Sequence, residues 1–139
     1  MSYEKWFDAH SCKHAEIMER LKSLTTDEVI EYFRFENMQK NEPYFCPLYA
    51  KNTKCHDIEE LNCYLCACPN FRFDDAGFKK IEERNLKSFC SIESKKGALF
   101  KTDDAIHQDC SSCDVPHKKK YIKTVFSRDW KHMMKDVML

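Results

Sequence analysis

Cysteine pairs are the residues of this sequence with the clearest potential for chemistry. Cys63 and Cys66 are separated by two residues in the C-x2-C pattern, and Cys110 and Cys113 repeat it, with His117 four positions further on. This spacing lets two thiolates from one tight turn reach a single ion. The sequence therefore predicts two metal-binding half-sites.

The number of cysteines predicts more than one site. Joining the two pairs would give a four-thiolate site of the zinc-ribbon type, although the 43 residues between Cys66 and Cys110 exceed the usual interval. The remaining candidate ligands are Cys46, Cys55, Cys68, Cys90 and His56. The four cysteines among them suit a second site, and His56 or His117 could replace a thiolate in either. We expect eight cysteines to hold close to two metal centres per chain.

Three other residues are not expected to bind metal. Cys12 lies alone on a predicted helix, and we expect it to be a small buried apolar side chain. His10 and His14 share a helical face at a spacing that can chelate metal, but His10 is not followed by the glutamate of the H-E-x-x-H motif. We expect both histidines to be packed or solvated.

Four segments together carry a family resemblance. They are Phe45-Cys46-Pro47, Cys55-His56-Asp57, the run from Asn62 to Pro69 and the run from Asp109 to His117. In this ordered series the chain resembles the cysteine-rich small domain family over about residues 34–122. The resemblance implies a zinc-finger-like, metal-binding protein of a kind found in anaerobic bacteria and archaea, with no settled biochemical role.

The ligand types leave two kinds of metal centre open. Thiolate-rich sites suit zinc, but four cysteines also suit an iron–sulfur cluster, and Cys68-Pro69 is similar to the Cys-Pro that ends many ferredoxin motifs. Cys63, Cys66 and Cys68 do not form the regular C-x2-C-x2-C series of bacterial ferredoxins, which favours zinc.

Three classes of function follow from these centres. A complete thiolate shell around zinc is structural, and it predicts a binding or adaptor module with a protein partner. Iron–sulfur clusters would instead make the chain an electron-transfer or redox protein. A metal-dependent enzyme would need an open metal position beside His56, Asp57 or His117. No substrate-binding motif accompanies these residues, so we expect the adaptor rather than the enzyme.

Charge and composition limit the partners. Equal numbers of basic and acidic residues, 23 of each, give no overall field to attract nucleic acid. We therefore interpret Lys118 to Lys120 as a solvated helix face and do not expect Phe71-Arg72-Phe73 to bind nucleic acid. The start of the sequence lacks the apolar run of a signal peptide, and no stretch is long enough to cross a bilayer. We therefore expect a cytoplasmic protein without disulfides or membrane insertion.

The elements that must position the cysteines are predicted as an α+β fold with a small, irregular, metal-nucleated centre. Apolar spacing predicts a first helix from Trp6 to Leu24, a second behind the capping box at Thr25 and Glu28, and a terminal helix after Pro116. A short helix is expected at 76–86 and a strand at 98–100. The predicted units are an N-terminal helical hairpin (1–40), a cysteine-rich metal-binding domain (41–122) and a C-terminal helix extension (123–139).

These elements also predict how the chain is stabilised. The segment from Cys46 to Cys113 is poor in long apolar stretches, so we expect it to depend on its metal. The flanking helices are expected to form a separate core, with Phe7, Leu21, Phe33, Phe126 and Trp130 packed against each other.

Overall fold

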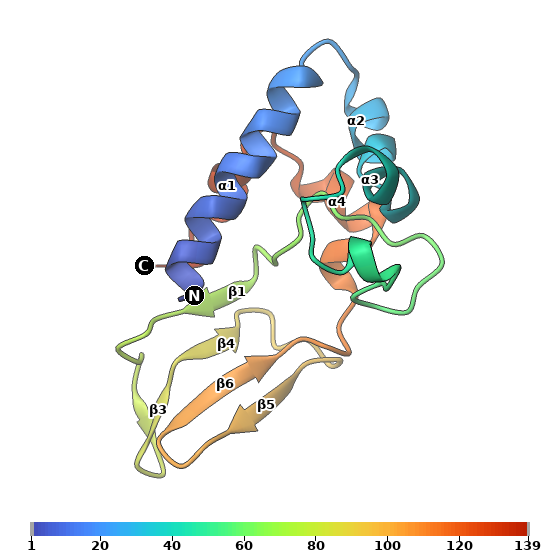
Figure 1. Ribbon diagram of the computed structural model, residues 1–139. Helices are drawn as coiled ribbons and strands as arrows, with labels where there is room; N and C mark the ends of the chain where they lie inside the picture. The colour runs from blue at the N-terminus through green and yellow to red at the C-terminus, as the bar shows by residue number, and fades with distance from the viewer. Residues whose placement is uncertain (1, 139) are drawn as a thin grey trace.

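The computed structural model describes residues 2–138 and divides them into a helical region and a sheet region (Figure 1). The helices are α1 (Tyr3–Arg20), α2 (Thr26–Tyr32), α3 (Phe35–Asn41), α4 (Lys119–Val125) and α5 (Trp130–Met133), with short 3-10 helices η1 (Tyr49–Lys51) and η2 (Val115–His117). The strands are β1 (Phe71–Phe73), β2 (Lys80–Ile81), β3 (Arg84–Leu86), β4 (Ser88–Cys90), β5 (Ala98–Lys101) and β6 (Ala105–Asp109). The predicted α+β class is confirmed, with helices at both ends of the chain.

Helix α1 forms the long edge of the helical region. The Ser2 side chain caps its first turn by accepting a hydrogen bond from the Lys5 amide at 3.3 Å. The buried positions are Phe7, His10, His14, Ile17 and Met18. They recur at intervals of three and four residues, so one stripe of α1 faces the core. The helix ends at Arg20, four residues before the predicted end.

The predicted second helix is divided into α2 and α3. The capping box is present, since the Thr25 hydroxyl accepts from the Glu28 amide and the Glu28 carboxylate accepts from the Thr25 amide. The helix then stops because the backbone at Phe33 and Arg34 pairs elsewhere. The Phe33 carbonyl accepts from the Cys63 amide at 2.8 Å, and Arg34 forms an isolated antiparallel bridge with Asn62. This pairing brings the first cysteine pair against the helices.

The predicted C-terminal helix is also divided. It forms η2, α4 and α5, with extended backbone at Phe126, and Asp129 caps α5 through a 3.1 Å bond from the Lys131 amide. The break lets the Trp130 indole donate to the Leu65 carbonyl at 2.6 Å.

The predicted helix at 76–86 is wrong. This segment contains the β2–β3 hairpin, in which Lys80 pairs with Asn85 and Ile81 with Arg84. The two loop residues, Glu82 and Glu83, both have positive φ angles, the backbone twist of a tight two-residue hairpin. Pairing of Leu86 with Ile106 overrides the local helical spacing. The strand predicted at 98–100 is confirmed as part of β5.

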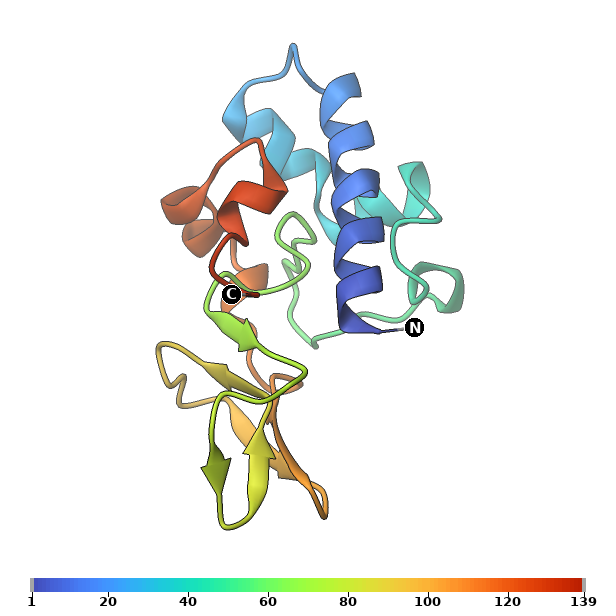
Figure 2. The same ribbon diagram turned by 90° about the vertical axis from the view of Figure 1, so that its left-hand side faces the viewer.

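The strands form two small sheets below the helices (Figure 2). One pairs β1 and β4 antiparallel, and the other has the order β2-β3-β6-β5, with β3 and β6 parallel and the other pairs antiparallel. The two sheets are joined where the Gln108 amide donates to the Ser88 hydroxyl at 2.7 Å and the Lys87 amide to the Ile106 carbonyl at 2.9 Å.

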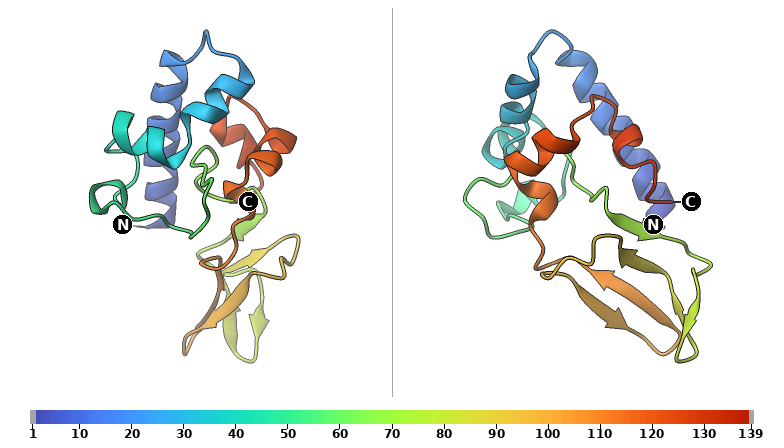
Figure 3. Two further views of the ribbon diagram at one scale, coloured as in Figure 1. Left: turned by 90° about the vertical axis from the view of Figure 1, so that its right-hand side faces the viewer. Right: turned by 180° about the vertical axis from the view of Figure 1, so that it is seen from behind.

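Residues near both ends of the described chain contact β1, and the C-terminal end lies beside this strand (Figure 3). The rings of Tyr3 and Phe73 are 4.8 Å apart between centroids, and Phe73 forms a parallel bridge with Met138. Strand β1 therefore joins the helical region to the sheet region, and the cysteine-bearing loops lie near this junction.

The hydrophobic core lies among the helices and draws on all three predicted units. It contains Phe7, Leu21, Phe33 and Trp130 as predicted, with Phe126 packed partly buried against it. It also contains Leu61, Tyr64 and Leu65, so the cysteine-rich segment contributes more apolar core than expected. The division into three units is not tested by this packing and remains a prediction.

Candidate metal centre

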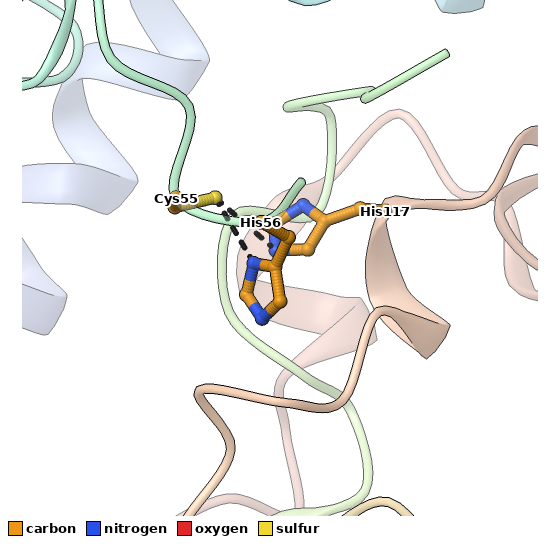
Figure 4. A group of neighbouring side chains, drawn as sticks. All are labelled: Cys55, His56 and His117. Carbon is orange, nitrogen blue, oxygen red and sulfur yellow. Dashed lines mark hydrogen bonds between the residues drawn. The ribbon is translucent and has the colours of Figure 1, made fainter. Parts of the chain in front are cut away.

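Cys55, His56 and His117 form the one group of metal-ligating side chains in residues 2–138 whose ligand atoms all lie within 4.8 Å of one another (Figure 4). Cys55 and His56 belong to the loop after η1, and His117 is the last residue of η2. The Cys55 sulfur is 3.2 Å from His56 Nδ1 and 3.7 Å from His117 Nε2. The two imidazole rings are 4.5 Å apart between centroids.

The orientation of His117 is fixed by the backbone. Its Nδ1 lies 3.0 Å from the Asn62 carbonyl oxygen, which can only accept, so Nδ1 carries the proton of the neutral ring. The Asn62 amide in turn donates to the His117 carbonyl at 3.1 Å. Nε2 consequently presents a lone pair toward Cys55.

His56 is oriented by the same kind of contact. Its Nε2 lies 3.0 Å from the Cys110 carbonyl oxygen, so Nε2–H donates and the Nδ1 lone pair faces the Cys55 sulfur. A thiol has one proton and can satisfy only one of two nitrogen lone pairs. A cation among the three atoms would satisfy all of them, and a backbone partner on the second ring nitrogen is typical of metal-binding histidines.

Burial favours the neutral forms of His117 and Cys55 in the absence of a cation. It lowers the pKa of His117 below its ordinary value, although the bond to the Asn62 carbonyl opposes the shift. The pKa of the Cys55 thiol is raised by burial and then by the nearby Cys46 sulfur. A neutral imidazole is the form that binds metal, and a bound cation favours the thiolate.

Cys63 lies in the hydrophobic core of the helical region, and Cys46 and Cys66 are packed against that core. Burial raises the pKa of Cys63 to about 12, the neighbouring Tyr49 opposes the shift, and Cys55 and Cys46 add to it. Burial raises the pKa of Cys66 well above its ordinary value, and its sulfur neighbours Cys63, Cys46 and Cys55 raise it further. These mutual effects indicate that Cys46, Cys55, Cys63 and Cys66 are neighbours, and we call them the first thiol group.

The other four predicted ligands form a second thiol group. Cys68, Cys90, Cys110 and Cys113 all border one small cavity of about 20 Å³. Burial raises the pKa of Cys110 to about 11, followed by the effects of Cys68, Cys113 and Cys90. The two C-x2-C pairs thus belong to different groups, although Cys66, Cys110 and Cys113 also border a larger pocket of about 330 Å³ beside His56.

The predictions for the three residues not expected to bind metal differ in how well the structure agrees with them. The prediction that Cys12 is buried is wrong, because α1 turns this side chain away from the core into solvent. His10 and His14 are packed in the core, 3% and 0% exposed, with His10 stacked on Trp6. All nine cysteines are unpaired.

Sequence reasoning did not identify Asn62 as part of the site. Its side chain is buried, donating to the Ile30 carbonyl at 2.7 Å and accepting from the Tyr64 amide at 2.9 Å, while its backbone holds His117. A polar residue directly before Cys63 was the sole signal, and it does not by itself predict a contact with residue 117.

Comparison with known proteins does not identify a relative. No known family matches the chain, and neither the curated proteins nor the solved structures contain a significant match. Within residues 2–138, no helix combines the length and apolar character needed to span a bilayer.

Proposed function

We propose that this chain is a metal-binding protein in which Cys55, His56 and His117 hold a zinc ion. The observation that carries the proposal is the direction of the two imidazole lone pairs, which both face the Cys55 sulfur while backbone carbonyls hold the opposite nitrogens. No contact within residues 2–138 explains this arrangement as well as a shared cation does.

The distances fit the dimensions of zinc. Zinc bonds of about 2.3 Å to sulfur and 2.0–2.1 Å to nitrogen, at a tetrahedral angle, separate the two ligand atoms by roughly 3.5 Å. The observed sulfur-to-nitrogen distances are 3.2 and 3.7 Å. One thiolate with two imidazoles is also a ligand set that suits zinc better than a hard cation such as magnesium.

The role we favour is a metal-stabilised binding or adaptor module of the cytoplasm, because a zinc ion with a complete protein ligand shell is structural. The ion would join the loop at Cys55 to η2, two segments that are far apart in the sequence, and a nearby thiol from Cys46, Cys63 or Cys66 could complete its shell. Exposed Leu99 and Phe100 on the edge strand β5 support a protein partner. Free thiols suit a reducing compartment.

A metal-dependent enzyme is the second candidate, because one observation favours it. The pocket of about 330 Å³ beside Cys55, His56 and His117 is also bordered by Tyr3, Trp6 and Phe71. An ion with three protein ligands keeps a fourth position for water or substrate, and this pocket would give access to it. The electron-transfer alternative predicts visible absorbance from iron–sulfur clusters, which a zinc protein lacks.

Metal analysis of variants tests the proposal. We expect His56→Ala and Cys55→Ser, purified without oxygen, each to lose about one equivalent of metal per chain relative to the unsubstituted protein. The matched controls are His132→Ala and Cys12→Ser, which change exposed residues. Circular dichroism would establish that each variant keeps its helices. Full metal content in His56→Ala would contradict this centre.

A further inference from the structure

The second thiol group, Cys68, Cys90, Cys110 and Cys113, lies at the junction of the two sheets. It is separate from the group around Cys55, and the sequence left its membership open. The course of the backbone explains how these four cysteines, spread over 46 positions of the sequence, come to border the same cavity.

The chain changes direction between the two thiol groups. Cys63 is part of the helical core, and Cys66 packs against that core with a left-handed φ of 34°. This conformation is unusual for a residue with a side chain. The next cysteine, Cys68, starts the turn into β1, in which the Phe71 amide donates to the Cys68 carbonyl at 3.0 Å. Cys66 and Cys68 are therefore directed to different groups despite being two residues apart.

Strand pairing places Cys90 beside this turn. Phe71 of β1 is directly opposite Cys90 of β4, and the Ser91 amide donates to the Asn70 carbonyl at 2.8 Å. The Cys90 amide also donates to the Gln108 side-chain oxygen at 3.2 Å, which links β4 to the end of β6.

The last two cysteines follow β6 directly. That strand ends at Asp109, and the chain then makes a tight turn in which the Cys113 amide donates to the Cys110 carbonyl at 3.0 Å. The Ser94 hydroxyl is 3.2 Å from the Cys113 sulfur, so it can donate to a thiolate. Thus β1, β4 and β6 together bring four sulfurs to the walls of one cavity.

The surroundings of the cavity suit a metal rather than an organic ligand. Its volume of about 20 Å³ is close to that of a single small occupant, since one water needs roughly 10–15 Å³. Apart from the cysteines, its walls are Phe71, Ile92, Ser94, Gly97, Gln108, Val115 and Pro116. No cationic side chain is among them, so thiolates here would require a metal for charge neutralisation.

We propose that Cys68, Cys90, Cys110 and Cys113 hold a second metal centre, with four thiolate ligands and a single thiophilic ion such as zinc. Tetrahedral zinc would hold the sulfurs about 3.8 Å apart. In residues 2–138 the Cys55 group is the one set of three or more ligand atoms within 4.8 Å of one another, so ion binding must draw these four sulfurs inward. The turn at Cys110 and the loop at Ser94 are the segments that would move.

Cadmium-113 NMR of the full chain tests the ligand type without a substitution. After exchange of the native metal for cadmium, we expect one resonance at the shift of an all-sulfur site, distinct from that of a mixed sulfur and nitrogen site. The absence of an all-sulfur resonance would overturn the proposal.

Metal counting tests the ligand set. Cys90 is the best position to change, because it lies outside both C-x2-C pairs and away from His56. We expect Cys90→Ser to lose one equivalent and the all-sulfur resonance, whereas His56→Ala keeps that resonance and Cys12→Ser changes neither. Retention of full metal content by Cys90→Ser would overturn the assignment. If the unsubstituted protein contains acid-labile sulfide and absorbs visible light, and Cys90→Ser loses both, the four cysteines hold an iron–sulfur cluster and the single-ion proposal is wrong. The centre at Cys55 is tested separately, because full metal content in His56→Ala would contradict that centre alone.

Discussion

The helical and sheet regions of this chain are stabilised in different ways. The helical region contains a continuous cluster of nineteen buried residues, to which all five α-helices, η1, the segment before β1 and the C-terminal end contribute. In the sheet region, from β1 to β6, the buried hydrophobic residues are Leu86, Ala105 and Ile106, while Leu99 and Phe100 are 54% and 57% exposed. Apolar burial stabilises a fold in proportion to the area removed from water, about 25 cal/mol per Å².

This difference indicates why the thiols gather where they do. Each of the three cysteine positions that connect to the sheets, Cys68, Cys90 and Cys110, lies at the end of a strand or in the turn next to one. A small sheet with so little core needs another source of stability, such as a bound metal. The contrast therefore predicts that the two regions respond differently to metal loss, to core substitution and to acid.

Metal removal should produce the largest difference between the regions. A structural zinc contributes roughly 10–16 kcal/mol of apparent binding free energy in small peptides, comparable with the whole stability of a domain at about 5–15 kcal/mol. Under strong chelation and reducing conditions, we expect hydrogen-exchange protection to be lost in β4, in β6 and between Cys110 and His117. We expect α1 to stay protected and the helical circular-dichroism signal to persist.

The segment from Cys63 to Cys68 sharpens this test. Its cysteines alone would predict loss of protection, but Tyr64 and Leu65 are fully buried in the helical core. We therefore expect protection at these two residues to survive metal removal, and added zinc to restore the strands. Unchanged protection in β4 and β6 after verified metal removal would show that the sheet region does not depend on metal.

Local patterns in the sequence were sufficient to predict parts of the helical region. The period of α1 and the capping box at Thr25 are interactions between near neighbours, which the sequence displays directly. The division at Phe33 and Arg34 could not be predicted in this way, since it depends on pairing with Asn62 and Cys63. The helix predicted at 76–86 was wrong for the same reason. This segment forms a hairpin because β3 pairs with the distant parallel strand β6.

The candidate centre shows the same limit. The residue types were sufficient to name all three members of the closest group, Cys55, His56 and His117, among ten candidate ligands. Which cysteines lie together was not predictable, because it depends on the left-handed backbone at Cys66 and on the register that places Phe71 opposite Cys90. Neither feature has a signal in the spacing of the cysteines.

Core substitutions should affect the helical region more than the sheet region. Trp130 is 2% exposed, and its indole bonds to the Leu65 carbonyl, so we expect Trp130→Ala to lower the free energy of unfolding by about 3–5 kcal/mol. The control is Leu99→Ala on the exposed face of β5, for which we expect a change within about 0.5 kcal/mol. Urea unfolding monitored by circular dichroism measures both. A cost at Leu99 equal to that at Trp130 would contradict the contrast between the regions.

The contribution of a single buried histidine to acid sensitivity should be the smallest of these effects, and it should act on the helical core. Burial, followed by the charges of His14 and Lys13, lowers the pKa of His10 to about 3. Burial lowers the pKa of His14 to about 4, although its bond to the Tyr64 carbonyl opposes the shift. In the unfolded chain both histidines titrate near pH 6.5. Between pH 6.5 and 4 the unfolded chain therefore binds protons that the folded chain does not, and stability falls as the pH falls.

The expected slope is about 1.4 kcal/mol per pH unit for each histidine, so the free energy of unfolding should fall steadily below pH 6.5. Metal-free protein is the suitable sample, because acid also releases metal from histidine and cysteine ligands. His10→Phe should reduce the slope by about 1.4 kcal/mol per pH unit, since it removes one buried-histidine titration, leaves those of His14 and His117, and replaces a ring whose Nε2 is buried without a partner in residues 2–138. The control is His132→Phe at an exposed position. Urea unfolding at pH 7, 6 and 5 measures the slope, and an unchanged slope in His10→Phe would show that this buried histidine does not link the helical core to pH.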